Sequence, residues 1–429
     1  MNRREFVTGA ALAGLFAGCR SADWAVAAAH PSAGSAWRGW KPGEFQVHFI
    51  YTGVGESQFM IFPDGTTMLL DCGDFAAHAR GALALPILPS MKCHAGEWIA
   101  RYVRRVNPCD NYVDYMMLSH FHSDHGGCNG WHAGMTDGRS PNYFLSGFAQ
   151  AAEWLHFGTA IDRGWPDYND PVPLADDFDQ GVLGNMKALY SHLQKRDGLK
   201  IEKFRLGASD QIVQKRIGKG HHAGFKAFNF AANGRICSPA DGTVRDLYAP
   251  YIATKPKKLD ENALSLGNLF SYGPFTYYTA GDFSSWYQLP DGTGCSFEEE
   301  LAKFMPRVEV AKINHHGYES MEPGLVKALD ARCYVACVWD QYHCLPVTME
   351  RIEGNATREH LYFPGMVPTK YIVDGKRLPW MAKAVEPSWE GMHTVLTVPR
   401  GGDRYTMTCL SAADESMTVK AEFEFKTEV

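Results

Sequence analysis

The segment MMLSHFHSDHGG at residues 116–127 concentrates side chains that bind metal ions. His120, His122, Asp124 and His125 fall within six positions, after an apolar run and before two glycines. A strand that ends in this pattern can direct alternate side chains into one pocket, while the following loop brings Asp124 and His125 round. Imidazole and carboxylate ligands suit Zn²⁺ and related ions. The segment therefore predicts a metal site.

Three later segments place further ligand candidates just after apolar runs. Asp282 follows FTYYTAG, the pair His315-His316 follows VEVAKIN, and His343 follows CYVACVWDQY. Acidic or imidazole groups past the ends of successive strands are how α/β sheets build sites. Asp282 is placed to bridge two ions, and two ions about 3.5–4 Å apart that share a carboxylate and a hydroxide form a hydrolytic centre.

The elements that must position these residues follow from apolar periodicity. FQVHFIYT, SQFMIF and TMLLDCG, from residue 45 onward, are β-rich runs separated by Gly, Pro and Asp. Residues 94–106 carry apolar positions at helical spacing, and VDYMMLSH is predicted as a buried strand that ends at His120. Strand, helix and strand in alternation favour an α/β sandwich.

The rest of the chain predicts more strands around a less regular middle. Residues 130–260 hold a predicted helix at 179–196 and a loop around 162–178, and we interpret them as an insertion on a core fold. The remaining predicted strands lie at 264–272, 275–280, 308–313 and 332–338. Residues 366–429 contain runs such as HTVLTVP, YTMTCL and VKAEFEFK, which predict a β-rich C-terminal extension.

Composition limits the classes of partner. The chain has 429 residues, of which 45% are hydrophobic and 21% charged, as in an ordinary globular protein. A formal net charge of −6 argues against a nucleic-acid-binding surface spread over the whole molecule. No run of 18 apolar residues is present, so we expect no transmembrane segment.

The first residues look like a targeting segment. MNRREFVTGAALAGLFAGC pairs Arg3 with Arg4 ahead of a small-residue apolar stretch, which resembles a twin-arginine export signal. We interpret residues 1–29 as this signal and expect the protein in the periplasm or at the cell surface. Two endings stay open: cleavage after Ala29, or a lipid anchor at Cys19. Disulfides are permitted there, although Cys333 and Cys337 fit buried thiols equally well.

Taken together, HFHSDHGG, MLLDCGD, TAGD and NHHG resemble the metallo-β-lactamase fold superfamily. They are similar to the branch that includes the hydrolase domain of the DNA-uptake channel protein ComEC and the phosphorylcholine esterases of teichoic acid. DENALSLGNLFSYGPFTYYTAGD resembles the N-x-x-S-L-x-L lead-in of that branch, and QYHCLP is a looser match to its Y-G-H-P. The resemblance implies a four-layer αββα sandwich, with the hydrolase domain at 45–360 and an insertion at about 130–260.

The resemblance also implies a ligand set for two zinc ions, although Mn²⁺ or Fe would fit the same ligands. One ion would be held by His120, His122 and one of His315 and His316, and the other by Asp124, His125 and His343, with Asp282 between them. Which of His315 and His316 is the ligand stays open.

Other residues near these motifs have two interpretations. Asp71 ends the MLLD strand, where it either orients a ligand or has a structural role. Asn262, Ser265, Trp286 and Tyr287 line the pocket or pack in the core. An additional histidine common in the superfamily has no clear counterpart here, since His221-His222 lies in a Gly- and Lys-rich loop that we interpret as solvated. His156 and His192 are interpreted as histidines on helix faces.

We therefore expect an exported dinuclear zinc hydrolase, and specifically a phosphodiesterase that uses a metal-bridging hydroxide. Asp124 would orient the hydroxide, and the non-ligating member of His315-His316 would protonate the leaving oxygen. The expected substrate is a small-molecule or cell-envelope phosphoester rather than long duplex nucleic acid. A lactone or β-lactam hydrolase on the same centre is the alternative, followed by a non-catalytic metal-binding module.

Overall fold

The computed structural model describes residues 33–51, 53–74, 85–127, 143–173, 177–216, 222–254, 260–283, 287–288, 294–340, 343–355, 357–362, 372–373, 376–377 and 391–428. The proposed export segment, with Arg3, Arg4, Cys19 and Ala29, lies outside these residues, as do His221 and Trp286. No helix within the described ranges is long and apolar enough to cross a bilayer.

Nine strands form the first sheet, in the order β21-β20-β19-β1-β2-β3-β4-β5-β6. Their bounds are β1 Phe45–Phe49, β2 Gln58–Ile61, β3 Thr67–Leu70, β4 Tyr112–Met117, β5 His156–Asp162, β6 Lys200–Lys203, β19 Met392–Val398, β20 Arg404–Ser411 and β21 Val419–Lys426. Strands β3 to β6 are parallel neighbours. The carboxyl ends of β3, β4 and β5 therefore meet at one edge, where Asp71, His120 and Arg163 follow them.

Eight strands form the second sheet, in the order β16-β15-β14-β11-β10-β7-β8-β9. Their bounds are β7 Phe225–Ala232, β8 Arg235–Cys237, β9 Val244–Asp246, β10 Gly267–Tyr272, β11 Phe275–Ala280, β14 Val310–Lys312, β15 Cys333–Val335 and β16 His360–Tyr362. Strands β11, β14, β15 and β16 are parallel neighbours. Asp282, His316 and His343 come after β11, β14 and β15, so these candidates also gather at one edge.

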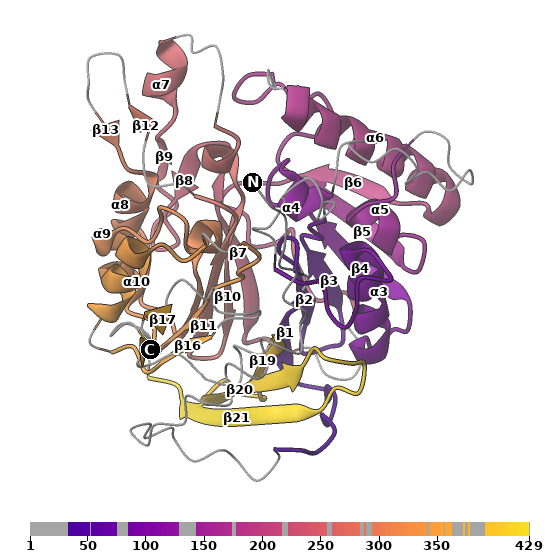
Figure 1. Cartoon of the computed structure of the whole chain (residues 1–429). Coiled ribbons are helices and arrows are strands. Elements are labelled where there is room, and N and C mark those ends of the chain that lie inside the picture. Colours follow the sequence, from indigo (N-terminus) through magenta and orange to yellow (C-terminus); the bar gives the residue numbers. More distant parts are fainter. Residues whose placement is uncertain are drawn as a thin grey trace, which may run out of the picture.

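The two sheets pack against each other, and helices cover their outer faces (Figure 1). Apolar side chains from both sheets, such as Phe45, Phe270 and Tyr277, form the core between them. The first sheet packs on α3 (Ala95–Val106), α5 (Phe148–Ala151) and α6 (Asp177–Asp197). The second packs on α8 (Phe297–Ala302), α9 (Pro323–Leu329) and α10 (Pro346–Glu353). The molecule is thus a mixed α/β structure with two large mixed sheets.

Most of the predicted elements are confirmed. Helix α3 buries Ile99, Val103 and Val106 at helical spacing, and α6 matches the predicted helix at 179–196 within two residues. Strand β5 was not predicted: its sequence HFGTAID was assigned no element, and His156 is its first residue rather than part of a helix. His192 does lie on a helix, α6, beside the ring of Tyr143.

Segments far apart in the sequence share the sheets. Residues 143–254 supply β5 and β6 to the first sheet and β7 to β9 to the second. The predicted β-rich extension supplies β19 to β21, and β19 pairs with β1 from Phe45↔Val398 to Phe49↔Thr394.

Cys333 and Cys337 are both buried free thiols, which is one of the two alternatives that the sequence left open.

Candidate metal centre

The predicted histidine loop is held close to the loops after β1 and β3. After β4, the chain reaches His120 and then a short helix, α4 (Ser123–Gly126), which carries Asp124 and His125. A Cβ on Gly73 would lie 1.8 Å from the carbonyl oxygen of Asp124, and one on Gly55 would lie 2.4 Å from the same atom. Only glycine allows so close an approach of the two backbones. In this position the histidine loop contacts Asp282 and His316, which follow strands of the second sheet.

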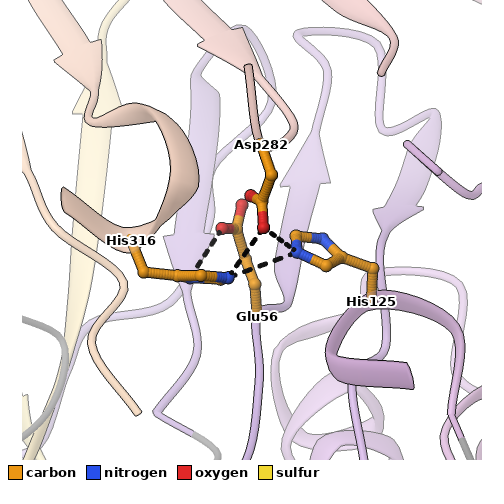
Figure 2. A group of neighbouring side chains, drawn as sticks. All are labelled: Glu56, His125, Asp282 and His316. Carbon is orange, nitrogen blue, oxygen red and sulfur yellow. Dashed lines mark hydrogen bonds and ion pairs between the residues drawn. The ribbon is translucent and has the colours of Figure 1, made fainter. Parts of the chain in front are cut away.

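Four buried side chains from both sheets form the centre of the site (Figure 2). Glu56, His125, Asp282 and His316 each offer a ligand atom, and these atoms all lie within 4.8 Å of one another. Asp282 Oδ2 is 3.0 Å from His125 Nε2 and 3.2 Å from His316 Nε2, and the two imidazole nitrogens are 3.3 Å apart. This cluster could hold a metal ion.

The other residues of the histidine loop adjoin this cluster. Asp124 Oδ2 lies 3.3 Å from His316 Nε2, and His120 Nε2 lies 3.9 Å from Asp282 Oδ2. His122 Nδ1 is 3.1 Å from His120 Nε2. The structure therefore brings together the metal-ligand candidates His120, His122, Asp124, His125, Asp282 and His316.

Hydrogen bonds on the far side of three imidazoles fix which nitrogen is free. His125 Nδ1 lies 2.7 Å from Asp71 Oδ2, and His316 Nδ1 lies 2.9 Å from the carbonyl oxygen of Cys337; both oxygens only accept. Ser119 Oγ donates to Asp71 Oδ2, so it accepts from His120 Nδ1 at 3.0 Å. All three rings thus carry hydrogen on Nδ1 and present Nε2, the arrangement that orients histidine metal ligands.

Asp71 is the shared acceptor behind the loop. Its Oδ1 accepts from the backbone N–H of Ser119 at 2.7 Å, and its Oδ2 accepts from Ser119 Oγ and from His125 Nδ1. Asp71 has a positive φ of 59°, and His315 and His316 have φ values of 47° and 53°. Such conformations cost of order 1–3 kcal/mol each and persist where the surroundings enforce them.

The inward-facing atoms fit a cation. Neutral His125 and His316 would point two lone pairs at each other across 3.3 Å, an arrangement that needs a proton or a metal ion between them. Asp282 Oδ1 is buried and has no hydrogen-bond partner among the residues that the structure describes. The donor set of imidazole nitrogens and carboxylate oxygens is the one that Zn²⁺ and neighbouring transition ions prefer.

Charges within the cluster shift its titration strongly. Burial alone would lower the pKa of His316, but Asp282 and Asp124 raise it to about 9. Burial likewise opposes charge on His125, whose pKa the carboxylates of Asp282 and Asp71 hold well above its usual range. Burial disfavours the charge of Asp282 and Asp124 too, yet the neighbouring imidazoliums hold both pKa values well below normal. The carboxylates therefore favour positive charge on His125 and His316, and a bound metal ion would also supply positive charge there.

Glu56 is the one cluster member that was not predicted. Its Oε2 forms an ion pair with Lys312 Nζ at 2.9 Å, and both side chains are fully buried. Lys312 Nζ also donates to the carbonyl oxygens of Ala280 and Gly281, just before Asp282. Glu56 Oε2 lies 3.6 Å from Nδ1 of His316, the nitrogen opposite the cluster centre. Because Lys312 neutralises Glu56, we interpret this pair as a support for His316 and Asp282.

A pocket of about 550 Å³ opens onto the cluster. It is lined by His122, Asp124, Asn262, Asp282, His315, His316, Tyr318, Trp339, Asp340, His343 and Leu345. The structure separates the histidine pair: His316 belongs to the cluster, whereas His315 faces the pocket. His315 Nε2 is 3.4 Å from Asn262 Nδ2, and within the described part of the chain its buried Nδ1 has no hydrogen-bond partner. Burial lowers the pKa of His315.

The remaining candidates divide between the pocket wall and other places. The ring of His343 stacks on that of His316, with centroids 4.8 Å apart, and Trp339 meets its edge. His222 is buried beside Tyr272 rather than solvated, and it does not line the pocket. Asn262 lines the pocket and Ser265 Oγ accepts from the backbone N–H of Asp282.

No protein-family model matches the chain, and no curated protein matches it either. The functional interpretation therefore depends on the geometry of the cluster and its pocket.

Proposed function

We propose that the chain is an exported, zinc-dependent hydrolase of the metallo-β-lactamase type that cleaves phosphodiesters. The observation that supports it best is the convergence of three imidazole Nε2 atoms, each with its Nδ1 hydrogen committed elsewhere, on the buried carboxylate of Asp282. With Nδ1 committed in this way, Nε2 is the nitrogen of each ring that would bind a metal ion, once any proton on it is displaced.

The number of donors supports two ions rather than one. A structural zinc ion takes four protein ligands, and a catalytic one takes about three. The cluster and the adjoining histidine loop together supply six donors: His120, His122, Asp124, His125, Asp282 and His316. His343 stacks on His316 beside them. Asp282 Oδ2 faces His120, His125 and His316, so its carboxylate would help to hold both ions.

Metal ions held there would supply Lewis acidity and acidify a water molecule at neutral pH. The chain's own residues would bind and orient the phosphoester and the attacking water. Asp124 is only 14% exposed in its side chain and reaches both the cluster and the pocket, so it is suited to orient that water. His315 lines the pocket from the turn after β14 and, because burial lowers its pKa, is suited to donate a hydrogen bond to the leaving oxygen, which would take its proton from solvent.

Asn262 sets the tautomer of that ring. Its Nδ2 donates toward His315 Nε2, which makes Nδ1 the protonated nitrogen of a neutral ring. A leaving oxygen in the pocket would accept a hydrogen bond from that Nδ1 hydrogen, which has no acceptor among the described residues. This contact would strengthen as negative charge develops on the oxygen in the transition state.

A substrate panel tests the proposal. Purified, zinc-loaded protein should hydrolyse bis-(nitrophenyl) phosphate and should act weakly on chromogenic lactones and β-lactams. Good activity on lactones or β-lactams without phosphodiester cleavage would reject the phosphodiesterase and leave a metallo-hydrolase of another substrate class. Mass spectrometry of the native protein tests export, since an intact Met1 start would contradict both cleavage after Ala29 and lipidation at Cys19.

A further inference from the structure

A fully buried ion pair lies directly behind the histidine loop. Arg163 is the first residue after β5 of the first sheet, and Glu261 precedes η2 (Asn262–Leu264), which leads into β10 of the second sheet. Their contact is bidentate, with Nε 2.6 Å from Oε1 and Nη2 2.7 Å from Oε2, and both side chains have 0% exposure. The pair therefore ties the two halves of the molecule together beside the site.

The pair holds Phe121 from two directions. The backbone N–H of Phe121 donates to Glu261 Oε1 at 3.0 Å, and the guanidinium carbon of Arg163 lies 5.3 Å from the centre of the Phe121 ring. Phe121 is the residue between His120 and His122, and it is itself fully buried. The peptide that joins two ligand candidates is thus fixed by a charged group from the opposite sheet.

The pair is also held in place by its own surroundings. Arg163 Nη1 donates to the carbonyl oxygen of Asp170 at 3.1 Å and lies 3.4 Å from Asn233 Oδ1. Asn233 Nδ2 donates back to the carbonyl oxygen of Arg163 at 2.9 Å. These bonds fix the orientation of the Arg163 guanidinium. The bidentate contact with the guanidinium then fixes the orientation of the Glu261 carboxylate.

Stability alone does not account for this arrangement. Replacing a buried ion pair by apolar side chains of similar size is often neutral or stabilising. The exception is a group that would lose its only acceptor, and without Glu261 the buried N–H of Phe121 would lack one. Loss of this acceptor would therefore destabilise the present conformation of the loop that carries His120 and His122.

We propose that Arg163 and Glu261 are positioning residues for the metal ligands His120 and His122, acting through the peptide of Phe121. Glu261 supplies the acceptor that fixes the loop, and Arg163 orients Glu261. This inference rests on the proposed metal centre. It requires the free energy of metal binding, and not only that of folding, to depend on the pair.

Two double variants isolate the acceptor. Arg163→Met with Glu261→Gln removes both charges but keeps a carbonyl oxygen for the N–H of Phe121, whereas Arg163→Met with Glu261→Met removes that oxygen too. Zinc affinity is measured by competition with a chromogenic chelator. Loss of a group that orients a ligand typically costs 10–100-fold in metal affinity. We expect roughly that loss for the Met/Met variant relative to the Met/Gln variant.

Asp114→Asn is the matched control. Asp114 is a buried carboxylate that pairs with Arg216, and it lies near the start of β4, whereas the histidine loop follows the end of that strand. Its zinc affinity should equal that of the wild type. Equal zinc affinity of the two double variants would overturn the proposal, as would an equal loss in the control. Failure of the wild type to bind zinc would instead reject the metal centre itself.

Hydrogen exchange of the wild-type protein tests the inference without any variant. Residue-resolved exchange should show the amide of Phe121 protected in the metal-free protein as well as in the zinc-loaded one, since Glu261 is its acceptor in both. Protection that arises only after zinc is added would show that the metal orders the loop, and would overturn the positioning role of the pair.

Discussion

Replacing Asp71 by asparagine should weaken metal binding while leaving the fold intact. Asp71 accepts three hydrogen bonds at 2.7 Å, two from Ser119 and one from His125 Nδ1. Asparagine has a similar shape and tolerates the positive φ of 59° at this position. Its Oδ1 can still accept from the backbone N–H of Ser119, but its NH₂ group faces the atoms that Oδ2 serves.

The magnitude follows from what happens to His125. Facing an NH₂ group, His125 Nδ1 must become an acceptor, which moves the ring hydrogen to Nε2, the nitrogen that points at Asp282. Reversing this tautomer to bind a metal sacrifices a hydrogen bond, and a charge-assisted bond of this kind contributes about 1.5–3 kcal/mol. We therefore expect zinc affinity to fall roughly 10–100-fold.

Competition for zinc with a chelator of known affinity measures the fall in zinc affinity. Asp114→Asn is the control for removing a buried carboxylate elsewhere on the sheet. The stability of metal-free Asp71→Asn, measured by urea unfolding, separates a folding defect from a binding defect. Unchanged zinc affinity in a folded Asp71→Asn protein would refute the assignment of His125 as a ligand through Nε2.

Four further predictions address other parts of the site. Asp282→Ala removes the carboxylate that faces three imidazoles, so elemental analysis should show loss of at least one ion per chain; retention of two ions would contradict the bridge. His315→Ala should lower turnover roughly 10²–10³-fold with metal content unchanged, because the donor to the leaving oxygen is lost, and a fall in metal content would place His315 among the ligands. Lys312→Met leaves Glu56 buried and unpaired, which should cost about 3–5 kcal/mol of unfolding free energy, whereas adding Glu56→Gln should recover most of it. Zinc affinity should rise with pH between 6.5 and 9, because the raised pKa of His316, about 9, means that the metal displaces a proton at neutral pH. The opposite sign applies to the stability of the metal-free fold, because the contribution from that proton is complete below pH 6.5 and is lost as pH rises through about 9. A zinc affinity independent of pH over this range would rule out the proton displacement.

The sequence predicts the strand ends well because local patterns encode them. Apolar runs followed by Asp, His and Gly mark where β3, β4, β11 and β14 end, and parallel pairing then brings those ends to one edge. The histidine pair could not be separated in the same way. His315 and His316 are adjacent residues in left-handed conformations, so their directions depend on the turn and not on strand alternation.

Long-range partners were the part that the sequence did not reveal. Glu56 lies in a glycine-containing loop, and its pairing with Lys312 joins residues 256 positions apart (312 − 56). Arg163 lies in no motif, and Glu261 directly precedes the Asn262 lead-in without being one of its defining positions, so each resembles an ordinary surface charge in the sequence. Strand β5 was missed because HFGTAID lacks clear alternation, although pairing with β4 and β6 on both sides buries most of it.

Metal titration of the purified protein with activity followed in parallel tests the central claim most directly. Metal-free protein should hydrolyse no bis-(nitrophenyl) phosphate, activity should return as zinc is added, and the titration should reach its end point at two zinc ions per chain. Phosphodiester hydrolysis by metal-free protein, or a chain that binds no zinc in the presence of excess metal, would contradict the proposed metallo-hydrolase.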